Sequence, residues 1–477
     1  MRVCLVGVWA SLLITTGIVG AAEESWPQFR GPGGRGVAHT SALPIHFGPT
    51  SNLQWQVTLP SGNSSPCIWK DRLFVTGYDG HILETLCLDR HSGKILWRRP
   101  TPVPKVEATH RLGNPATPTP CTDGSHVFAY FGSFGVVAYS LDGEPQWVAP
   151  LPTPDVEFGT SASPILVQNR LILLRDQDDH SHLLALNAAD GREVWRVDRA
   201  LFRRSFSTPF LWEHDNTQEL VVPGSIWLRS YDPTDGHELW SYAGTSRVAN
   251  TTPVAEGDWL VYASWNIGGD ASSRITMPPS EEFFAANDVD KDRRLSKEEI
   301  PSGPVRERFS QMDINRDNYV SPEEWEMMRE MFDKASNGVL AMRAGARGNL
   351  SETNLAWRST RSLPYVSSPL VHHGRVFTMK NGGLASCYDL KTGKVFYQDE
   401  RVGVVGDYYS SAIVADGKIF IGSQSGTLVV LREGEALEVL ARNDLGQSMM
   451  STPAAVGRSL YVRAGDTLFA FSLAQAP

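Results

Sequence analysis

Residues 65–97 read SPCIWKDRLFVTGYDGHILETLCLDRHSGKILW, four short runs in which apolar and polar residues alternate. Gly and Asp residues separate the runs, which is typical of a four-stranded antiparallel sheet. The unit opens on Ser65-Pro66 and closes on Gly93-Lys-Ile-Leu-Trp97. Related units recur along the chain, and their opening dipeptides are Thr117-Pro118, Ser163-Pro164, Thr208-Pro209, Thr252-Pro253, Ser368-Pro369, Ser411-Ala412 and Thr452-Pro453.

Eight such openings predict an all-β fold, an eight-bladed β-propeller of four-stranded antiparallel blades. One small sheet cannot bury both of its faces, whereas copies stacked around an axis can. The eighth copy ends at Phe469-Ala-Phe471 without a closing Trp strand, and a spare strand, residues 53–57, precedes the first copy. We therefore expect this strand to complete blade eight and close the ring. The Trp residues that end the units should bury their rings between neighbouring blades.

The small hydroxyl residues that open the units are expected to surround the channel of the propeller. They could bind a ligand there, or they could be small residues that fill the crowded axis, which is the interpretation we favour. They are Ser65, Thr117, Ser163, Thr208, Thr252, Ser368, Ser411 and Thr452.

An insert of about 70 residues interrupts the fifth unit, because 116 residues separate Pro253 from Pro369 where other steps are 41–52. By register the insert lies between the second and third strands of blade five. The chain is thus divided into residues 1–22, a signal peptide; 23–266, blades one to five with the closing strand; 267–337, the insert; and 338–477, the rest of blades five to eight.

The insert contains two twelve-residue loops, residues 288–299 and 313–324, with the oxygen ligands and the final Glu of a pair of EF-hands. Such loops wrap a hard cation, and the bidentate Glu favours Ca²⁺, so we expect about two calcium ions. Loop one would use Asp288, Asp290, Asp292, Ser296, Glu299 and the carbonyl of Arg294. Loop two would use Asp313, Asn315, Asp317, Ser321, Glu324 and the carbonyl of Tyr319.

Both loops depart from the usual pattern at position 6, where a left-handed backbone favours Gly. Loop one has Arg293 there and loop two has Asn318, which tolerates that conformation better, so loop two should bind calcium more tightly. Leu295 and Val320 should join the loops through a short β-bridge. Phe284, Ile300, Phe309, Met312 and Trp325 should form a small core. The loops lie close together in sequence, which favours a structural or buffering role over a sensor's opening motion.

The net charge of −9 argues against a general nucleic-acid binder. Residues 281–333 hold 15 acidic and 8 basic residues, so most of the negative charge belongs to the insert. We expect the insert to lie over one mouth of the channel, drawn to basic loops that link the blades, as a calcium-dependent cover or a rigid decoration. Those loops carry Arg111, Arg203, Arg204, Arg247 and Arg361.

The first 22 residues have the basic start, apolar run and small residues of a cleaved signal peptide, with a membrane anchor as the alternative. We therefore expect an exported protein, periplasmic or secreted, with no membrane span after cleavage. Cys67, Cys87, Cys121 and Cys387 remain in the mature chain. Their register in the ring places them too far apart for disulfides, so all four should be free thiols.

The run Asp89-Arg-His-Ser-Gly-Lys-Ile-Leu-Trp97 resembles the PQQ-like propeller repeat, and Ser25-Trp-Pro-Gln-Phe-Arg-Gly-Pro32 is similar to the start of exported bacterial proteins with such repeats. That family includes quinone-dependent alcohol dehydrogenases and the assembly factor BamB. The resemblance implies this propeller type and leaves two functions open. The dehydrogenases carry adjacent cysteines and a calcium site in the ring, which this sequence lacks, so a PQQ cofactor is not expected.

We therefore expect a non-enzymatic, calcium-binding propeller, a monomer that acts as a scaffold for an unknown protein or envelope partner. The alternatives are a quinone-dependent oxidoreductase and a calcium-gated carbohydrate- or peptide-binding protein. The sequence offers no candidate catalytic residues. His372-His373 lies in a strand turn and is expected to be solvated rather than to bind a metal.

Overall fold

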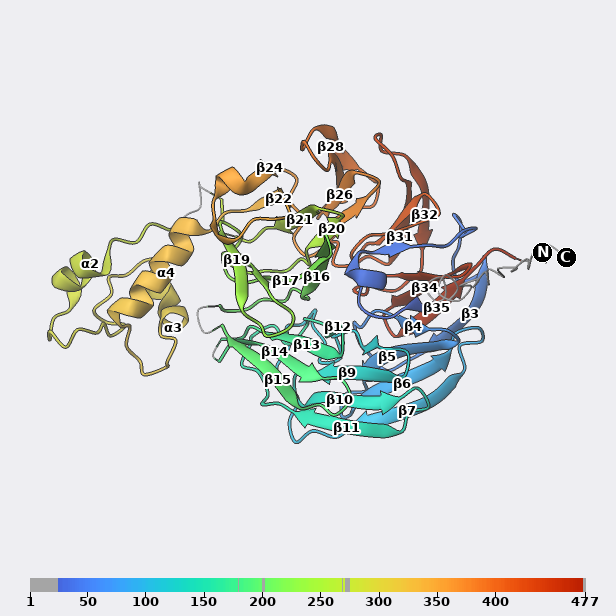
Figure 1. Ribbon diagram of the computed structural model, residues 1–477, viewed down its shortest axis with the longest axis horizontal. Helices are drawn as coiled ribbons and strands as arrows, with labels where there is room; N and C mark the ends of the chain where they lie inside the picture. Colours follow the sequence, from blue (N-terminus) through green and yellow to red (C-terminus); the bar gives the residue numbers. More distant parts are fainter. Residues whose placement is uncertain (1–24, 179, 200–201, 268, 271–274, 475–477) are drawn as a thin grey trace, which may run out of the picture.

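Eight small sheets surround a common axis in the computed structural model, which describes residues 25–178, 180–199, 202–267, 269–270 and 275–474 (Figure 1). The predicted signal peptide lies outside the described residues. Each sheet is a blade, and the successive strands of its repeat lie farther and farther from the axis. Eight blades are what the eight repeated units predict. Among the described residues, the helices are too short and too polar to cross a bilayer.

Blades one to four follow the sequence order of the repeats. Their strands are β1 (Ser25–Trp26), β4 (Cys67–Trp69), β5 (Arg72–Tyr78), β6 (Leu83–Asp89) and β7 (Ile95–Thr101); β8 (Cys121–Thr122), β9 (His126–Phe131), β10 (Gly135–Ser140) and β11 (Pro145–Pro150); β12 (Ile165–Val167), β13 (Arg170–Arg175), β14 (His182–Asn187) and β15 (Glu193–Asp198); and β16 (Phe210–His214), β17 (Thr217–Pro223), β18 (Trp227–Tyr231), β19 (Glu238–Ala243) and β23 (Gly348–Leu350).

Blades five to eight complete the circle. Their strands are β20 (Val254–Glu256), β21 (Trp259–Ser264), β22 (Gly338–Arg343) and β24 (Leu355–Ser359); β25 (Leu370–His372), β26 (Arg375–Lys380), β27 (Leu384–Asp389) and β28 (Val395–Arg401); β2 (Val37–Ala38), β29 (Ile413–Ala415), β30 (Lys418–Gly422), β31 (Thr427–Arg432) and β32 (Val439–Asp444); and β33 (Ala454–Val456), β34 (Ser459–Ala464), β35 (Thr467–Phe471) and β3 (Leu53–Thr58). Short 3-10 turns occur at Pro32–Gly34 and Glu352–Asn354.

The spare N-terminal strand closes the ring as predicted. β3 pairs antiparallel with β35, from Leu53 opposite Phe471 to Thr58 opposite Thr467, and becomes the outer strand of blade eight. The sequence did not predict the extra strands β1, β2 and β23, which widen blades one, seven and four to five strands. β2 pairs in parallel with β29, and β23 pairs in parallel with β19. Both strands cover blade edges that would otherwise be open.

Five closing Trp residues, Trp55, Trp97, Trp147, Trp195 and Trp357, dock their blades on the next. The Trp55 indole N–H donates to the Arg90 carbonyl at 3.0 Å, and its ring lies so close to Gly93 that a Cβ there would be 2.6 Å away. Trp97 makes the same contacts with Leu141 and Gly143 of blade two. The Gly of the repeat therefore serves two purposes, since its φ is positive and its missing side chain admits the neighbouring indole.

The helical insert leaves the ring between β21 and β22. It contains α2 (Ser280–Asn287), a 3-10 turn (Arg306–Arg308), α3 (Phe309–Met312) and α4 (Pro322–Lys334). Its five predicted core residues, Phe284, Ile300, Phe309, Met312 and Trp325, are all buried in one cluster.

The insert lies beside the ring, next to blade four, rather than over the channel, so the predicted position is wrong (Figure 1). Its apolar core extends onto Ile226 and Trp227 of blade four, and the Lys334 ammonium lies 5.1 Å from the Trp227 ring centre. Two of the basic residues that the sequence singled out do contact the insert, since Arg203 donates to the Gln311 carbonyl and the Arg247 guanidinium lies 5.4 Å from the Phe332 ring centre. The ion pair between insert and ring has the opposite polarity, because Arg316 of the insert pairs with Asp155 of the ring. Apolar burial therefore decides the position, since screened charge attraction between exposed groups is weak.

The four described cysteines are buried, and none forms a disulfide, as predicted. Burial raises the pKa of the Cys87 and Cys387 thiols to about 12. Buried, protonated thiols are poor nucleophiles. Thiol titration of the mature chain under denaturing, non-reducing conditions should therefore find four free groups. Two or fewer would show that the thiols pair in spite of this arrangement.

Candidate functional site

The two acidic loops of the insert have the same backbone conformation. Arg293 and Asn318, both at position 6, have φ values of 65° and 68°, the left-handed turn that the sequence required there. Position 4 is left-handed as well, in Lys291 and Arg316. The expected bridge is present, since Leu295 and Val320 exchange two backbone hydrogen bonds of 2.9 Å.

Equivalent hydrogen bonds hold the final glutamate of each loop across its own loop. Glu299 Oε1 accepts from the Val289 N–H at 2.9 Å, and Glu324 Oε1 accepts from the Ile314 N–H at 2.8 Å. The other oxygen of each accepts from the N–H of Ser296 or Ser321. The N–H of Ser296 is also the largest influence that lowers the pKa of Glu299, which keeps this carboxylate charged.

The donor set of loop one fits a hard cation. Ligand oxygens of Asp288, Asp290 and Asp292 lie within 4.8 Å of one another, and one oxygen of the half-buried Asp288, Oδ1, is inaccessible to solvent and has no hydrogen-bond partner. A buried carboxylate oxygen without a partner is costly unless a cation satisfies it. Carboxylate, hydroxyl and carbonyl oxygens are the ligands that Ca²⁺ prefers.

Loop two is the more buried of the loops. Asp313 and Glu324 are buried, whereas Glu299 is half-exposed and Asp290 and Asp292 are exposed. Glu324 also forms a capping box with Ser321 at the start of α4, so the helix itself orients the carboxylate. These contacts support tighter calcium binding by loop two, in the order that Asn318 and Arg293 predict.

A second candidate site is the cavity on the propeller axis, about 400 Å³ in volume. It opens among the loops that link successive blades. Its described lining combines aromatic rings with neutral hydrogen-bonding groups and contains no Asp, Glu, Lys or Arg; the rings belong to Phe29, His110, Phe158, Phe206, Tyr365 and Tyr409. Burial raises the pKa of Tyr409 to about 12, so its phenol stays neutral.

The ring of hydroxyl residues surrounds this cavity, and its members also join neighbouring blades through hydrogen bonds. At seven blade interfaces a backbone N–H of one blade donates to the hydroxyl oxygen of the next, as from Ser65 to Thr119 at 3.0 Å and from Thr452 to Ser65 at 2.9 Å. The member from blade two is Thr119 rather than the predicted Thr117. Two Thr-Pro pairs stand in tandem there, and only the pairing of Cys121 with Phe128 shows which opens the strand.

Glu107 lies behind the cavity wall, and sequence analysis missed it because no motif surrounds it. Its Oε2 accepts from the backbone N–H of Thr160 at 3.2 Å and from the Thr160 hydroxyl at 2.7 Å, while its buried Oε1 has no partner. Burial raises the pKa of Glu107 to about 7. Thr160 lines the cavity, so this carboxyl contacts the cavity wall from behind.

This raised pKa predicts a pH dependence of stability. The folded chain holds the Glu107 proton up to about pH 7, whereas the unfolded chain loses it near pH 4.5, so stability should fall as pH rises between these values. The difference corresponds to about 3 kcal/mol. Urea unfolding of the natural chain and of Glu107→Gln, each at pH 5 and pH 8, should show a smaller loss in the variant. Equal losses would contradict the burial of a titrating carboxyl.

The fold and its repeats define a propeller of the quinoprotein type. The sequence model described as outer membrane protein assembly factor BamB matches residues 47–158, 87–309 and 334–475. The chain therefore belongs to the BamB family. No curated protein matches this sequence.

Solved structures share the fold at low sequence identity. BamB from Moraxella catarrhalis is 11% identical, with a TM-score of 0.55, covering 88% of this chain and 99% of its own. Quinohemoprotein alcohol dehydrogenase from Comamonas testosteroni is 10% identical, with a TM-score of 0.56, and the match covers 96% of this chain and 82% of the dehydrogenase. A europium-containing methanol dehydrogenase is 10% identical, with a TM-score of 0.57, and the match covers 94% of this chain and 98% of the dehydrogenase. At these identities the likeness establishes the fold alone.

The side chains that line the axial cavity differ from the partners that the quinone of such dehydrogenases would need. That cofactor carries carboxylates, which need cationic partners, and its calcium needs carboxylate ligands. The described lining offers neither a cation nor a carboxylate. The calcium ligands that the sequence predicts lie instead in the insert, away from the axis (Figure 1).

Proposed function

We propose that this chain is an exported, calcium-binding propeller that acts as a non-enzymatic interaction scaffold in the cell envelope. The axial cavity carries the proposal. Its aromatic and neutral polar lining is typical of surfaces that anchor a partner's side chains, and its described members include one imidazole, His110, but no carboxylate, Lys or Arg. Membership of the BamB family supports an envelope location.

The partner should insert an uncharged segment among the aromatic rings at the cavity mouth. Phe158 is 41% exposed and packs edge-on against Phe206 at 5.9 Å between ring centres, which leaves a rigid apolar step on the loop face. Tyr409 adds a phenol whose oxygen lies 3.3 Å from Asp407 Oδ2. Rigid aromatic groups supply contact area at low entropic cost, so they suit an interaction centre.

A neutral carbohydrate is the second candidate ligand. The same rings could stack on sugar faces, and Asn63, Asn250 and Asn266 at the cavity wall offer amide donors and acceptors to sugar hydroxyls. Calcium would stabilise the neighbouring insert in either case. Because the insert lies beside blade four, the proposed role of the ion is structural.

Affinity capture from native envelopes tests the proposal. The natural chain should retain a specific protein that the double variant Phe158→Ser, Tyr409→Ser loses by at least about tenfold, since interface aromatics commonly contribute 2 kcal/mol or more. Val148→Ser, which changes an exposed residue on an outer strand, is the matched control and should retain it. Equal capture by all three chains contradicts the scaffold. Loss of a bound neutral polysaccharide instead of a protein would favour the carbohydrate ligand.

A further inference from the structure

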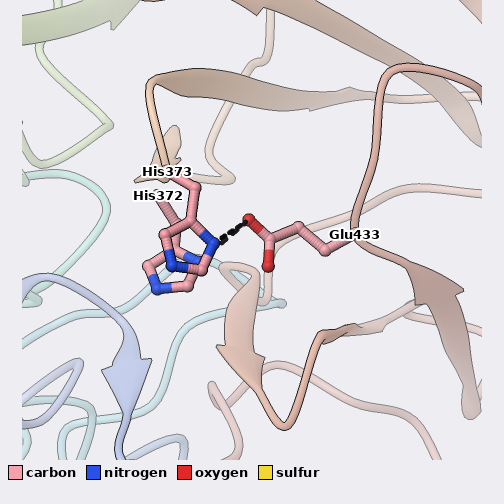
Figure 2. Close-up of side chains that lie close together, drawn as sticks. All are labelled: His372, His373 and Glu433. Atoms are coloured by element: carbon pink, nitrogen blue, oxygen red, sulfur yellow. Dashed lines mark hydrogen bonds and ion pairs between the residues drawn. The ribbon is translucent and has the colours of Figure 1, made fainter.

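Two histidines and a glutamate meet between blades six and seven. His372 ends β25, His373 begins the turn to β26, and Glu433 follows β31 of the next blade. Figure 2 shows the two imidazole rings one over the other beside the carboxylate, and their ring centres lie 3.7 Å apart. By the order of the strands, these turns lie on the opposite face of the ring from the loops around the axial cavity.

Three nitrogen atoms converge on one oxygen of this cluster. Glu433 Oε1 lies 2.9 Å from His372 Nδ1, 3.2 Å from His373 Nδ1 and 2.9 Å from an Arg375 Nη2. A carboxylate oxygen has only two lone-pair directions, so it cannot accept three well-aligned hydrogen bonds. Hydrogen bonding alone therefore explains this arrangement poorly.

We propose that His372, His373 and Glu433 bind a borderline transition-metal ion of the Zn²⁺ class. Ligand atoms around such an ion, at about 2.0–2.1 Å from it, lie roughly 3.0–3.4 Å from one another, close to the separations between Oε1 and the two Nδ1 atoms. With the ion bound, both Nδ1 atoms direct lone pairs to the metal. Arg375 then remains as an outer hydrogen-bond donor that orients the carboxylate.

The chemistry of the ligands separates this site from the acidic loops of the insert. Imidazole nitrogens favour Zn²⁺, Ni²⁺ or Cu²⁺, whereas the all-oxygen loops favour Ca²⁺. The side chain of Glu433 is 8% exposed and that of His372 is 23% exposed, while His373 is 67% exposed. Glu433 and the half-buried His372 therefore fix the site, and the exposed His373 leaves an entry path and a position for water.

The backbone holds the three side chains in place before any ion binds. His373 and Gly374 both have positive φ, 50° and 69°, as a two-residue hairpin turn requires. The Gly374 N–H donates to Glu256 Oε2 of blade five at 2.7 Å, and the Glu433 N–H donates to the Gly417 carbonyl at 3.0 Å. A bound ion would thus join blade six to blade seven.

Zinc titration of the metal-stripped chain, with calcium present to fill the insert loops, tests the site. The natural chain should bind one Zn²⁺ that His373→Asn, His372→Ala and Glu433→Gln each weaken by more than about 100-fold, since loss even of an outer partner costs 10–100-fold. Asn tolerates the left-handed turn at residue 373, which protects the fold. Cobalt in place of zinc should give visible absorption that the same variants lose.

His237→Asn is the matched control. This exposed histidine also lies near two carboxylates, Asp232 and Asp235, but as the single imidazole of one turn. The control should bind zinc as the natural chain does. Unchanged affinity in His373→Asn and His372→Ala, no zinc binding by the natural chain, or loss in His237→Asn would overturn the proposal.

Discussion

Replacing Trp55 by alanine should lower the free energy of unfolding by about 3–5 kcal/mol, the usual cost of removing a buried tryptophan. Trp55 belongs to the closing strand β3 and is 8% exposed. Its ring fills the space over Gly93 of blade one and lies 6.0 Å from the Tyr461 ring of blade eight, between ring centres. The substitution leaves a cavity at the closure and removes the shorter of two hydrogen bonds to the Arg90 carbonyl, the other coming from the Tyr461 hydroxyl at 3.4 Å.

Urea unfolding followed by circular dichroism measures this loss of stability. Two further variants separate the contribution of the hydrogen bond from that of the ring and provide a control. Trp55→Phe keeps most of the ring but loses the indole N–H, so it should forfeit at least the ~1 kcal/mol of one hydrogen bond and less than alanine does. Leu96→Ala, on an exposed part of β7, should change stability by less than about 0.5 kcal/mol. A Trp55→Ala variant as stable as Leu96→Ala would contradict the role of the indole in closing the ring.

Glu324→Gln should weaken calcium binding by loop two on the order of 100-fold, because it removes a bidentate charge from the ligand set. The capping box at the start of α4 should survive, since Gln can replace Glu there. The defect should therefore concern the ion rather than the fold of the insert.

Calorimetry on the natural chain should find about two calcium ions, and Glu299→Gln serves as the paired variant. The site left in Glu299→Gln, which is loop two, should be the tighter of the two remaining sites. Tighter binding in Glu324→Gln than in Glu299→Gln would contradict the ranking. Two undiminished sites in both variants would show that the ions bind elsewhere.

The sequence predicted those parts of the fold that repeat. The recurring Pro and Gly-x-x-x-Trp positions revealed eight blades, and the missing last strand revealed that β3 closes the ring. The left-handed turns at Arg293 and Asn318 followed from the spacing of the acidic loops. Each of these features depends on residues close together in the chain, or on equivalent positions of the repeat.

The features that the sequence did not predict depend on contacts between distant loops. The insert rests on Ile226 and Trp227 of blade four, an apolar contact that net charge could not reveal. Glu433 faces His372 across a blade interface, although 61 positions separate them. The tandem Thr-Pro pairs concealed the register of Thr119, and Glu107 became a candidate only when its burial was known.

Photo-crosslinking in cells tests the scaffold most directly. A photoreactive phenylalanine derivative at Phe158 or Tyr409, on the rim of the axial cavity, should yield a discrete protein adduct on irradiation. The same group at Val148, on an outer strand and 53% exposed, should yield none. An adduct at the cavity positions alone is the result we predict; no adduct at either cavity position, or the same adducts at Val148, would contradict a partner bound over the propeller axis.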